Sequence, residues 1–189
     1  PRIQEFMQLN PEIEVELVFD DKELDLSTRQ ADIGIFMRRP KKLNYIQRKL
    51  IDINYHIYGS SKYLEKHGMP KTINDLNKHK FISFGKGAPS PVYNPDWALK
   101  IGMKDNGKRK SVMKVNSVMG LLLAVESGVG LAALPDYLVF QSTNLIKVLP
   151  KVEGPITEAH FVYPQSLKNV ARVQAFRNFL FSKISEWKF

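Results

Sequence analysis

The sequence predicts an α/β protein made of two α/β lobes that are joined by two crossing strands. Helix-like and strand-like patterns alternate along the 189 residues, which is typical of an α/β sheet. Two extended segments, Tyr45–Tyr58 and Ala159–Tyr163, lie far apart in the sequence and are each placed to cross between lobes. We therefore expect residues 1–55 and 160–189 to form the first lobe and residues 56–159 the second, with a ligand cleft between them.

The first lobe is predicted to begin with a helix, because apolar residues recur at helical spacing until Asn10-Pro11 ends them. Apolar and acidic residues then alternate over Ile13–Phe19, as in a half-buried strand. A short helical piece is expected near Lys22–Arg29. The run Ile33–Met37 is continuously apolar, which predicts a parallel strand covered on both faces. Strand, helix and strand in this order imply a right-handed crossover.

The second lobe is predicted to contain short helices and strands that alternate. Helices are expected over Lys62–His67, Thr72–Leu76, Ser117–Glu126 and Asp136–Phe140. Strands are expected over Phe81–Phe84, Trp97–Met103, Ser111–Val115, Leu131–Leu134 and Leu145–Leu149. Gly85–Pro95 has the composition of a loop, and Asp105-Asn106-Gly107 predicts a turn between two strands. The last helix, Val170–Trp187, returns to the first lobe.

The chain carries 28 Lys and Arg residues against 19 Asp and Glu residues, a formal net charge of +9. The excess lies mainly in residues 51–110, as scattered lysines and the short cluster Lys108-Arg109-Lys110. We interpret these residues as solvated surface charge, because no zinc-finger spacing, basic zipper or RNA-binding aromatic signature accompanies them.

Composition and spacing exclude several classes of site. The absence of cysteine removes disulfides, iron–sulfur clusters and thiolate metal sites, and it fits a reducing compartment. No apolar run reaches the roughly 18 residues of a membrane span. The sequence has no Gly-x-Ser-x-Gly elbow and no Walker-type loop, which serine hydrolases and phosphate-transferring enzymes need. The histidines are too widely spaced for a metal site: His56, His67, His79 and His160.

One glycine motif, Gly128–Ala133, matches the loose G-x-G-x-x-A dinucleotide pattern. That motif requires a strand before it and a helix after it, whereas here the predicted helix comes first. We therefore interpret Gly128 as a left-handed helix cap and Gly130 as a residue that lets a strand start close to its neighbours.

Two features are candidates for binding an anion. The segment Val115-Asn116-Ser117 joins a strand to an apolar helix, so Asn116 or Ser117 is its N-cap. The same helix start would also present free N–H groups and a positive dipole to a carboxylate. Arg38 follows a predicted strand at the end where open α/β sheets bind ligands, and it is either a ligand contact or a solvated loop arginine.

A series of short motifs runs through nearly the whole chain. They are Phe6–Leu17, Ala31–Ile35, Arg48–Leu50, Tyr63–Pro70, Asp75–His79, Val115–Ser117, Ser127–Pro135, Leu145–Leu149 and Arg172–Leu180. Each motif is short, but together and in this order they are specific. The chain resembles the effector-binding domain of LysR-type transcriptional regulators.

The resemblance implies a periplasmic-binding-protein-like fold of type 2, with a small and often anionic effector bound between the lobes. It further implies no enzymatic activity, no cofactor, no metal, a cytoplasmic location and a homodimer, with a tetramer possible for the full-length protein. DNA binding is expected to belong to an N-terminal helix-turn-helix domain outside this sequence. The family's domain starts with a strand, whereas this chain starts on a helix, so an N-terminal strand is expected to be missing.

The pocket positions of the family carry over to eight residues, and none of them has a catalytic or metal-binding role. The effector-binding residues implied are Phe19, Met37, Arg38, Ser83, Phe84, Asn116, Ser117 and Phe161. A periplasmic-type solute-binding protein with the same fold is the alternative. An enzyme on this scaffold would need a catalytic constellation that the sequence does not indicate.

Overall fold

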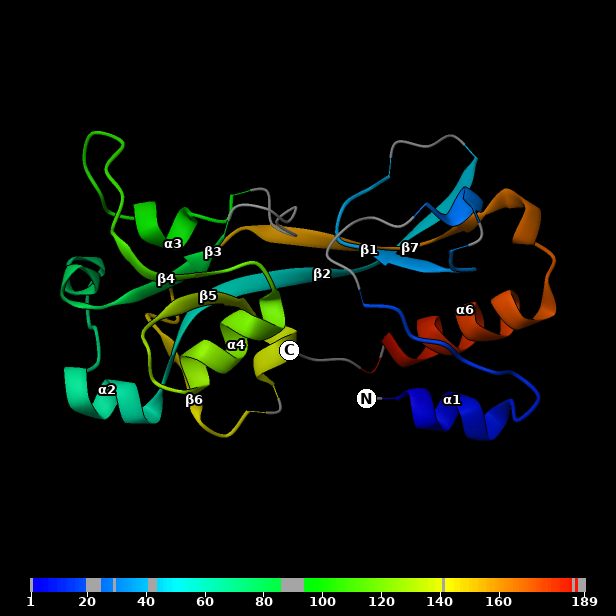
Figure 1. Ribbon diagram of the computed structural model, residues 1–189, viewed down its shortest axis with the longest axis horizontal. Helices are drawn as coiled ribbons and strands as arrows, with labels where there is room; N and C mark the ends of the chain where they lie inside the picture. The colour runs from blue at the N-terminus through cyan, green and yellow to red at the C-terminus, as the bar shows by residue number, and fades with distance from the viewer. Residues whose placement is uncertain are drawn as a thin grey trace. The chain divides into compact units, whose positions relative to one another are not determined.

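The computed structural model describes residues 2–19, 25–28, 30–40, 44–85, 94–140, 142–184 and 186. These residues form two compact units. The first unit combines the described residues up to Asp52 with those from Glu158 through the C-terminal helix, and the second is Ile53–Thr157. The sequence places these boundaries at residues 55 and 159. Two strands pass from one unit into the other: β2 (Tyr45–Ser60) and β7 (Ile156–Pro164) (Figure 1).

The first unit is built on paired strands that two helices cover. β1 (Gly34–Phe36) pairs with β7, which in turn pairs with β2. The helices α1 (Ile3–Leu9) and α6 (Ala171–Ile184) lie on one side of these strands, with α6 nearer to them (Figure 1). Two short 3-10 turns, η1 (Leu26–Thr28) and η3 (Gln165–Leu167), complete the described elements of this unit.

Aromatic rings hold α1 and α6 together. Phe6 is buried, and its ring centroid lies 5.0 Å from that of Phe176 and 5.3 Å from that of Phe179. Phe176 also packs against Phe161 of β7. The apolar spacing that predicts both helices from the sequence thus places their side chains in one aromatic core.

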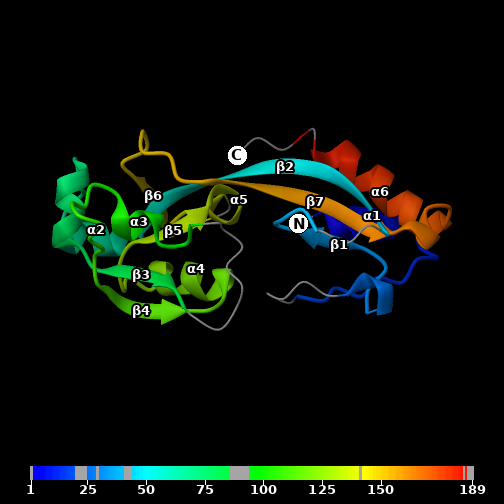
Figure 2. The ribbon, with the colours of Figure 1, turned by 90° about the horizontal axis from the view of Figure 1, so that it is seen from above.

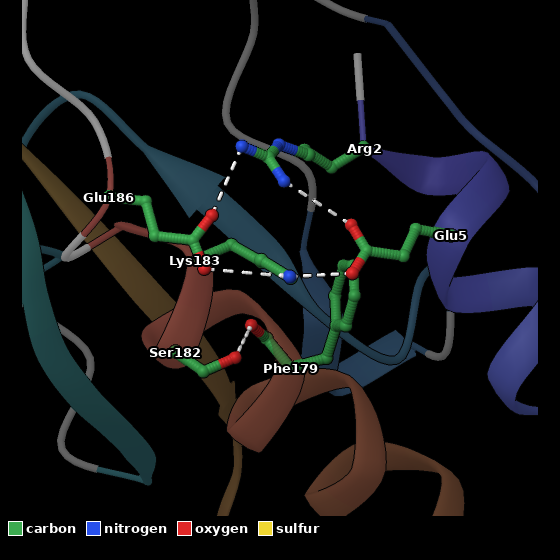
Figure 3. Close-up of polar contacts among 6 residues, drawn as sticks. All are labelled: Arg2, Glu5, Phe179, Ser182, Lys183 and Glu186. Carbon is green, nitrogen blue, oxygen red and sulfur yellow. Dashed lines mark hydrogen bonds and ion pairs between the residues drawn. The ribbon is translucent and has the colours of Figure 1, made fainter.

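A surface network of ion pairs joins the same two helices (Figure 3). Lys183 pairs with Glu5 and with Glu186, and Arg2 pairs with the same two carboxylates at 3.4 and 3.0 Å. The hydrogen bond between Lys183 and Glu5 lowers the pKa of the Glu5 carboxyl and raises the pKa of the Lys183 ammonium. Because exposed ion pairs contribute little free energy, the network orients the helices more than it stabilises them.

The second unit contains two sheets and the helices packed on them (Figure 2). Its helical elements are α2 (Ser61–His67), η2 (Ile73–Lys78), α3 (Trp97–Lys100), α4 (Val118–Glu126) and α5 (Asp136–Val139). β2 pairs antiparallel with both β5 (Ala132–Pro135) and β6 (Leu145–Val148), whereas β3 (Phe81–Phe84) runs parallel to β4 (Ser111–Val115).

The core of the second unit forms between α4 and the strands β3, β4 and β5. It consists of Tyr58, Ile82, Leu121, Leu122, Ala124, Val125, Ala132, Leu134 and Val139. Four of these residues come from α4, which explains why the sequence of this helix is almost wholly apolar. Among the described residues, no helix is both long and apolar enough to cross a membrane.

Most predicted elements of the second unit are confirmed, together with their caps. α2 is preceded by its N-cap Ser60, whose side chain accepts a hydrogen bond from the first turn, and is followed by Gly68 with a φ of 86°. Gly128 has a φ of 83°, which confirms its interpretation as a helix cap. A Cβ atom on Gly130 would lie 2.6 Å from the carbonyl oxygen of Lys80, so this close approach requires glycine.

The prediction of a strand at Ile13–Phe19 is wrong. The segment is irregular. Ile13 and Val15 are half-buried and Glu14 and Glu16 exposed, as the alternation requires, but Leu17 and Phe19 are exposed too. A strand also needs a neighbour with which to exchange backbone hydrogen bonds, and no described strand pairs with this segment. The crossover expected after it fails for the same reason. The helical piece Lys22–Arg29 is described only over η1, and its remainder lies outside the described residues.

The prediction that Ile33–Met37 is a parallel strand covered on both faces is also wrong. β1 runs antiparallel to β7, with Ile35 opposite Phe161. Gly34 and Phe36 are buried, whereas Ile35 is 43% exposed. One face of β1 is therefore covered and the other open, which is normal for an antiparallel strand.

The strand predicted over Trp97–Met103 is a short helix instead. Trp97, Ala98 and Leu99 are all buried, and the helix α3 ends at Lys100. The turn that follows is confirmed, with positive φ angles at Asp105 and Asn106. The predicted loop Gly85–Pro95 and the end of the predicted helix Val170–Trp187 lie largely outside the described residues.

Arg109 explains why α3 forms, and it is not the solvated residue that the sequence predicts. Its guanidinium is buried, and its Nη1 donates to the carbonyl oxygens of Ala98 and Ile101 at 3.3 and 2.8 Å. It therefore satisfies carbonyls that the helix end would leave without partners. Its Nε donates to Asn77 at 2.8 Å, which ties α3 to η2.

Candidate functional site

The carboxyl ends of two parallel strands meet beside the start of α4 in the second unit. Phe84 of β3 lies opposite Val115 of β4, and the N–H of Gly85 donates to the Val115 carbonyl at 2.8 Å. The chain then continues directly to Ser117, the N-cap of α4. Four predicted site residues thus come together at one edge of the unit: Ser83, Phe84, Asn116 and Ser117.

The start of α4 has the electrostatic character of an anion site. The side chain of Ser117 accepts a hydrogen bond from the N–H of Gly120 at 3.5 Å, and Asn116 is exposed. This cap uses one of the first four N–H groups of the helix, whose positive dipole end lies here. The first turn of α4 carries no acidic side chain that would compete with an anion.

A small cavity of about 30 Å³ lies at this helix start. Its walls are chiefly apolar and aromatic, and its lining includes Ser83, Phe84 and Val118, the first residue of α4. Ser83 donates a hydrogen bond to the hydroxyl of Ser111 at 2.9 Å. Trp97 also lines the cavity, and its buried Nε1 has no hydrogen-bond partner among the described residues. The edge therefore combines an anion-attracting helix start with a water-sized apolar recess that holds a few polar groups.

The remaining candidates lie in the first unit. Met37 and Arg38 directly follow β1, where Met37 is half-buried and Arg38 is exposed. Phe19 is 92% exposed and belongs to the irregular segment after α1. These three residues remain candidates on the strength of the resemblance, with Arg38 as the cation among them.

The position of Phe161 argues against the binding role expected for it. Its side chain has no exposed surface and packs in the core of the first unit against Tyr163, Val173 and Phe176. A ligand would have to displace this close-packed core to touch the ring. We therefore assign Phe161 to the core and remove it from the candidate site.

The second unit contains a buried polar cluster that the sequence does not predict. Asp136 accepts a hydrogen bond from Tyr58 at 2.8 Å and lies 2.8 Å from Nδ1 of His56 and 3.1 Å from Nζ of Lys147. Burial, together with the hydrogen bond to Asp136, raises the pKa of the Tyr58 phenol. Because its members satisfy one another, we interpret the cluster as a structural link between β2, α5 and β6.

Trp97 is a further cavity residue that the sequence does not predict. The reason is the strand expected over Trp97–Met103, which would have placed the indole elsewhere. Within the described ranges, no group of three or more His, Asp or Glu side chains could hold a metal ion.

Comparison with known proteins identifies relatives along the whole chain. The family model of the LysR substrate binding domain matches residues 1–184. An uncharacterized HTH-type transcriptional regulator of Haemophilus influenzae is 30% identical over 168 residues, which are 87% of this chain and 57% of that protein. The HTH-type transcriptional regulator YhjC of Escherichia coli is 27% identical over 190 residues, covering 99% of this chain and 63% of that protein. The chain thus spans about three fifths of these relatives.

Solved structures share the fold. The regulatory domain of CrgA, a LysR-type transcriptional regulator from Neisseria meningitidis, superposes with a TM-score of 0.82 at 23% identity, covering 97% of this chain and 90% of that one. The effector domain of AmpR from Pseudomonas aeruginosa gives a TM-score of 0.73 at 16% identity, covering 98% and 88%. These matches confirm the predicted periplasmic-binding-protein-like α/β fold.

The relatives are named as transcriptional regulators, so the comparisons do not favour the alternative of a solute-binding transport protein. The family match covers nearly every residue, and the solved structures agree with it in fold. The chain therefore belongs to the LysR substrate-binding domain family, whose members form the effector-binding part of LysR-type transcriptional regulators.

Proposed function

We propose that this domain binds a small organic anion and that the bound anion changes how a longer regulator acts on its DNA. The observation that carries the proposal is the edge formed by Ser83, Phe84, Asn116 and Ser117, where two parallel strand ends meet the start of α4. We further propose that Phe19, Met37 and Arg38 contribute from the first lobe, and that the lobes comprise residues 1–55 with 160–189 and residues 56–159.

The chemistry of this edge suits a carboxylate on an apolar or aromatic body. Backbone N–H groups at the start of α4 and the amide of Asn116 would bind the carboxylate. The recess beside them, lined by Phe84 and Trp97, has a volume of only about 30 Å³, so the uncharged part would lie over its mouth rather than inside it. To act as a signal, the anion must bind one arrangement of the regulator more tightly than another.

Replacement of Asn116 by alanine is expected to weaken anion binding about tenfold, the effect of losing one charge-assisted hydrogen bond. The measurement is a thermal-shift screen of small aliphatic and aromatic carboxylates, because a ligand at about 100 times its dissociation constant adds roughly 2.7 kcal/mol of stability. Titration of the best ligand then gives its affinity for both proteins.

Asn74→Ala is the matched control, since Asn74 is an exposed asparagine of η2 in the same unit. It should leave the affinity unchanged. An Asn116→Ala protein that binds as tightly as the unmodified one would remove the helix start from the site. A screen in which no carboxylate shifts the melting temperature would contradict the proposed class of effector.

We also propose that the domain self-associates through α4. Met119 and Leu123 lie one helical turn apart and are 52% and 60% exposed. Two large apolar side chains on one exposed face favour a protein interface. A homodimer would cover them, and a tetramer of the full-length protein would retain the same contact.

The double substitution Met119→Asp with Leu123→Asp is expected to abolish this association, because it places two carboxylates in an apolar interface. Sedimentation velocity over a concentration series should show a dimer for the unmodified chain and a monomer for the variant. Ile156→Asp, a change at another strongly exposed apolar residue, should stay dimeric. A monomeric unmodified chain at all concentrations would exclude this interface.

We propose that DNA recognition belongs to a helix-turn-helix domain of the longer protein and that this domain itself is not an enzyme. The names of its relatives support both proposals. Such a regulator would act in the cytoplasm, where its DNA lies.

A further inference from the structure

A second hollow in the second unit is separate from the proposed effector site. It has a volume of about 580 Å³, within the range of small-molecule sites. It is bounded by α2, by the start of β3, by β4 and by the turn that follows α4. The residues that line it are Lys62, Tyr63, Lys66, His67, Lys80, Val112, Met113, Ser127, Gly128 and Val129.

The charged groups of this groove are all basic. Lys62 and Lys66 lie one turn apart on α2, His67 follows them, and Lys80 comes from the segment before β3. The described lining contains no carboxylate. None of the three lysines forms an ion pair within the part of the chain that the structure describes. Cations that converge on a concave surface without counter-charges attract anions.

The groove has a fixed wall. Tyr63 is buried, and its ring stacks on that of His67 with centroids 4.5 Å apart. The Tyr63 hydroxyl accepts a hydrogen bond from the backbone N–H of Lys80 at 2.9 Å. One buried side chain thus positions two of the basic residues, and a preorganised wall lowers the entropic cost of binding.

The turn after α4 borders the groove at the negative end of the helix dipole, but the last carbonyls of α4 are already hydrogen-bonded. The last carbonyls accept hydrogen bonds from the turn itself: Ser127 N–H to Leu123, Gly128 N–H to Val125, and Val129 N–H to Ala124. Val112 and Met113 of β4 are exposed and apolar. The groove therefore offers ammonium groups for an anion and an apolar surface for an attached organic body.

We propose that this groove binds a phosphorylated small molecule. Three lysine ammonium groups line the groove and act as point charges, so they attract a phosphate monoester, with a charge of about −1.5 to −2, more strongly than a carboxylate with a single charge. The volume and concave form fit a phosphate ester with an organic substituent. The groove lies at the C-terminal end of α4, on the order of 14 Å along the helix from the effector site at its N-terminal end.

Phenyl phosphate, inorganic phosphate and a short DNA duplex are the probes for isothermal titration calorimetry of the 189-residue chain at 150 mM salt. We expect phenyl phosphate to bind more tightly than inorganic phosphate, because only the ester uses the apolar surface. The double variant Lys62→Glu with Lys66→Glu should weaken phenyl phosphate binding at least tenfold. Backbone amide signals of Val112, Met113 and Gly128 should shift in NMR spectra on titration.

The matched control is Lys104→Glu with Lys151→Glu, which changes the net charge equally at two exposed lysines of the same unit outside the groove. It should bind phenyl phosphate as the unmodified chain does. Circular dichroism should show that every variant is folded. The proposal would be overturned if phenyl phosphate did not bind, or if both double variants weakened its binding equally. It would also be overturned if the DNA duplex bound more tightly than phenyl phosphate and lost affinity in Lys62→Glu with Lys66→Glu.

Discussion

Replacement of Arg109 by methionine is expected to lower the free energy of unfolding of the second unit by about 3 kcal/mol. Methionine keeps much of the volume of the side chain but none of its donors. The melting temperature should fall by roughly 6–12 °C if the two units unfold together. Urea unfolding followed by circular dichroism and by tryptophan fluorescence, which includes buried Trp97, measures the effect.

The reason is the set of acceptors that the guanidinium serves. Arg109 is only 7% exposed and donates to the carbonyl oxygens of Ala98, Ile101 and Ile73 and to the side chain of Asn77. Without it, these partly buried acceptors lose their partner, and each unsatisfied buried group is costly. Burial also lowers the pKa of the guanidinium, which nevertheless stays protonated near neutral pH.

Lys110→Met provides the comparison, because it removes a positive charge from an exposed neighbour. Its stability should match that of the unmodified chain within experimental error. If Arg109→Met and Lys110→Met were equally stable, the buried hydrogen bonds would not hold α3 in place.

Phe161→Ala is expected to lower the free energy of unfolding by about 4 kcal/mol, because it leaves a cavity in a close-packed aromatic core. The ring centroid of Phe161 lies 5.6 Å from that of Tyr163 and 6.0 Å from that of Phe181. Phe161→Leu, which refills part of the space, should lose less. Denaturant unfolding measures the free energy of unfolding of the unmodified chain, Phe161→Ala and Phe161→Leu. Effector affinity is then measured for each protein under conditions where it is folded.

Phe19→Ala makes the test decisive, since it removes an exposed ring from the same unit. It should leave stability unchanged while weakening effector binding if Phe19 contacts the ligand. Phe161→Ala should lower the free energy of unfolding and leave effector affinity unchanged. A stable Phe161→Ala protein that no longer binds the effector would return Phe161 to the site and contradict its assignment to the core.

Local signals in the sequence predict much of the second unit correctly. Ser60 and Ser117 predict helix N-caps because their hydroxyls accept hydrogen bonds from backbone N–H groups, and Gly128 predicts a helix end because glycine adopts a positive φ. The structure places each residue at the predicted helix end. The clustering of Ser83 with Ser117 follows from the parallel register of β3 and β4, which short-range patterns do not specify. The likeness to a known family supplied that information.

The errors share a physical origin. Ile13–Phe19 alternates as a strand does, but alternation does not supply a pairing partner. Trp97 and its neighbours resemble a buried strand in sequence, but they form a helix whose last carbonyl oxygens accept hydrogen bonds from the side chain of Arg109, beyond the following turn. Phe161 occupies the expected strand, and its burial depends on rings contributed by α6. In each case the outcome depends on an interaction, present or missing, with residues outside the segment itself.

The discontinuity of the first unit has a consequence for the order of events on the ribosome. Proteins are made from the N-terminus, so α1 leaves the ribosome well before Phe176 and Phe179, the partners that bury Phe6. The whole of Ile53–Thr157 is synthesised in between and contains every strand and helix of its own core. The inserted unit can therefore fold first, while the aromatic face of α1 stays uncovered and in need of protection until synthesis reaches α6.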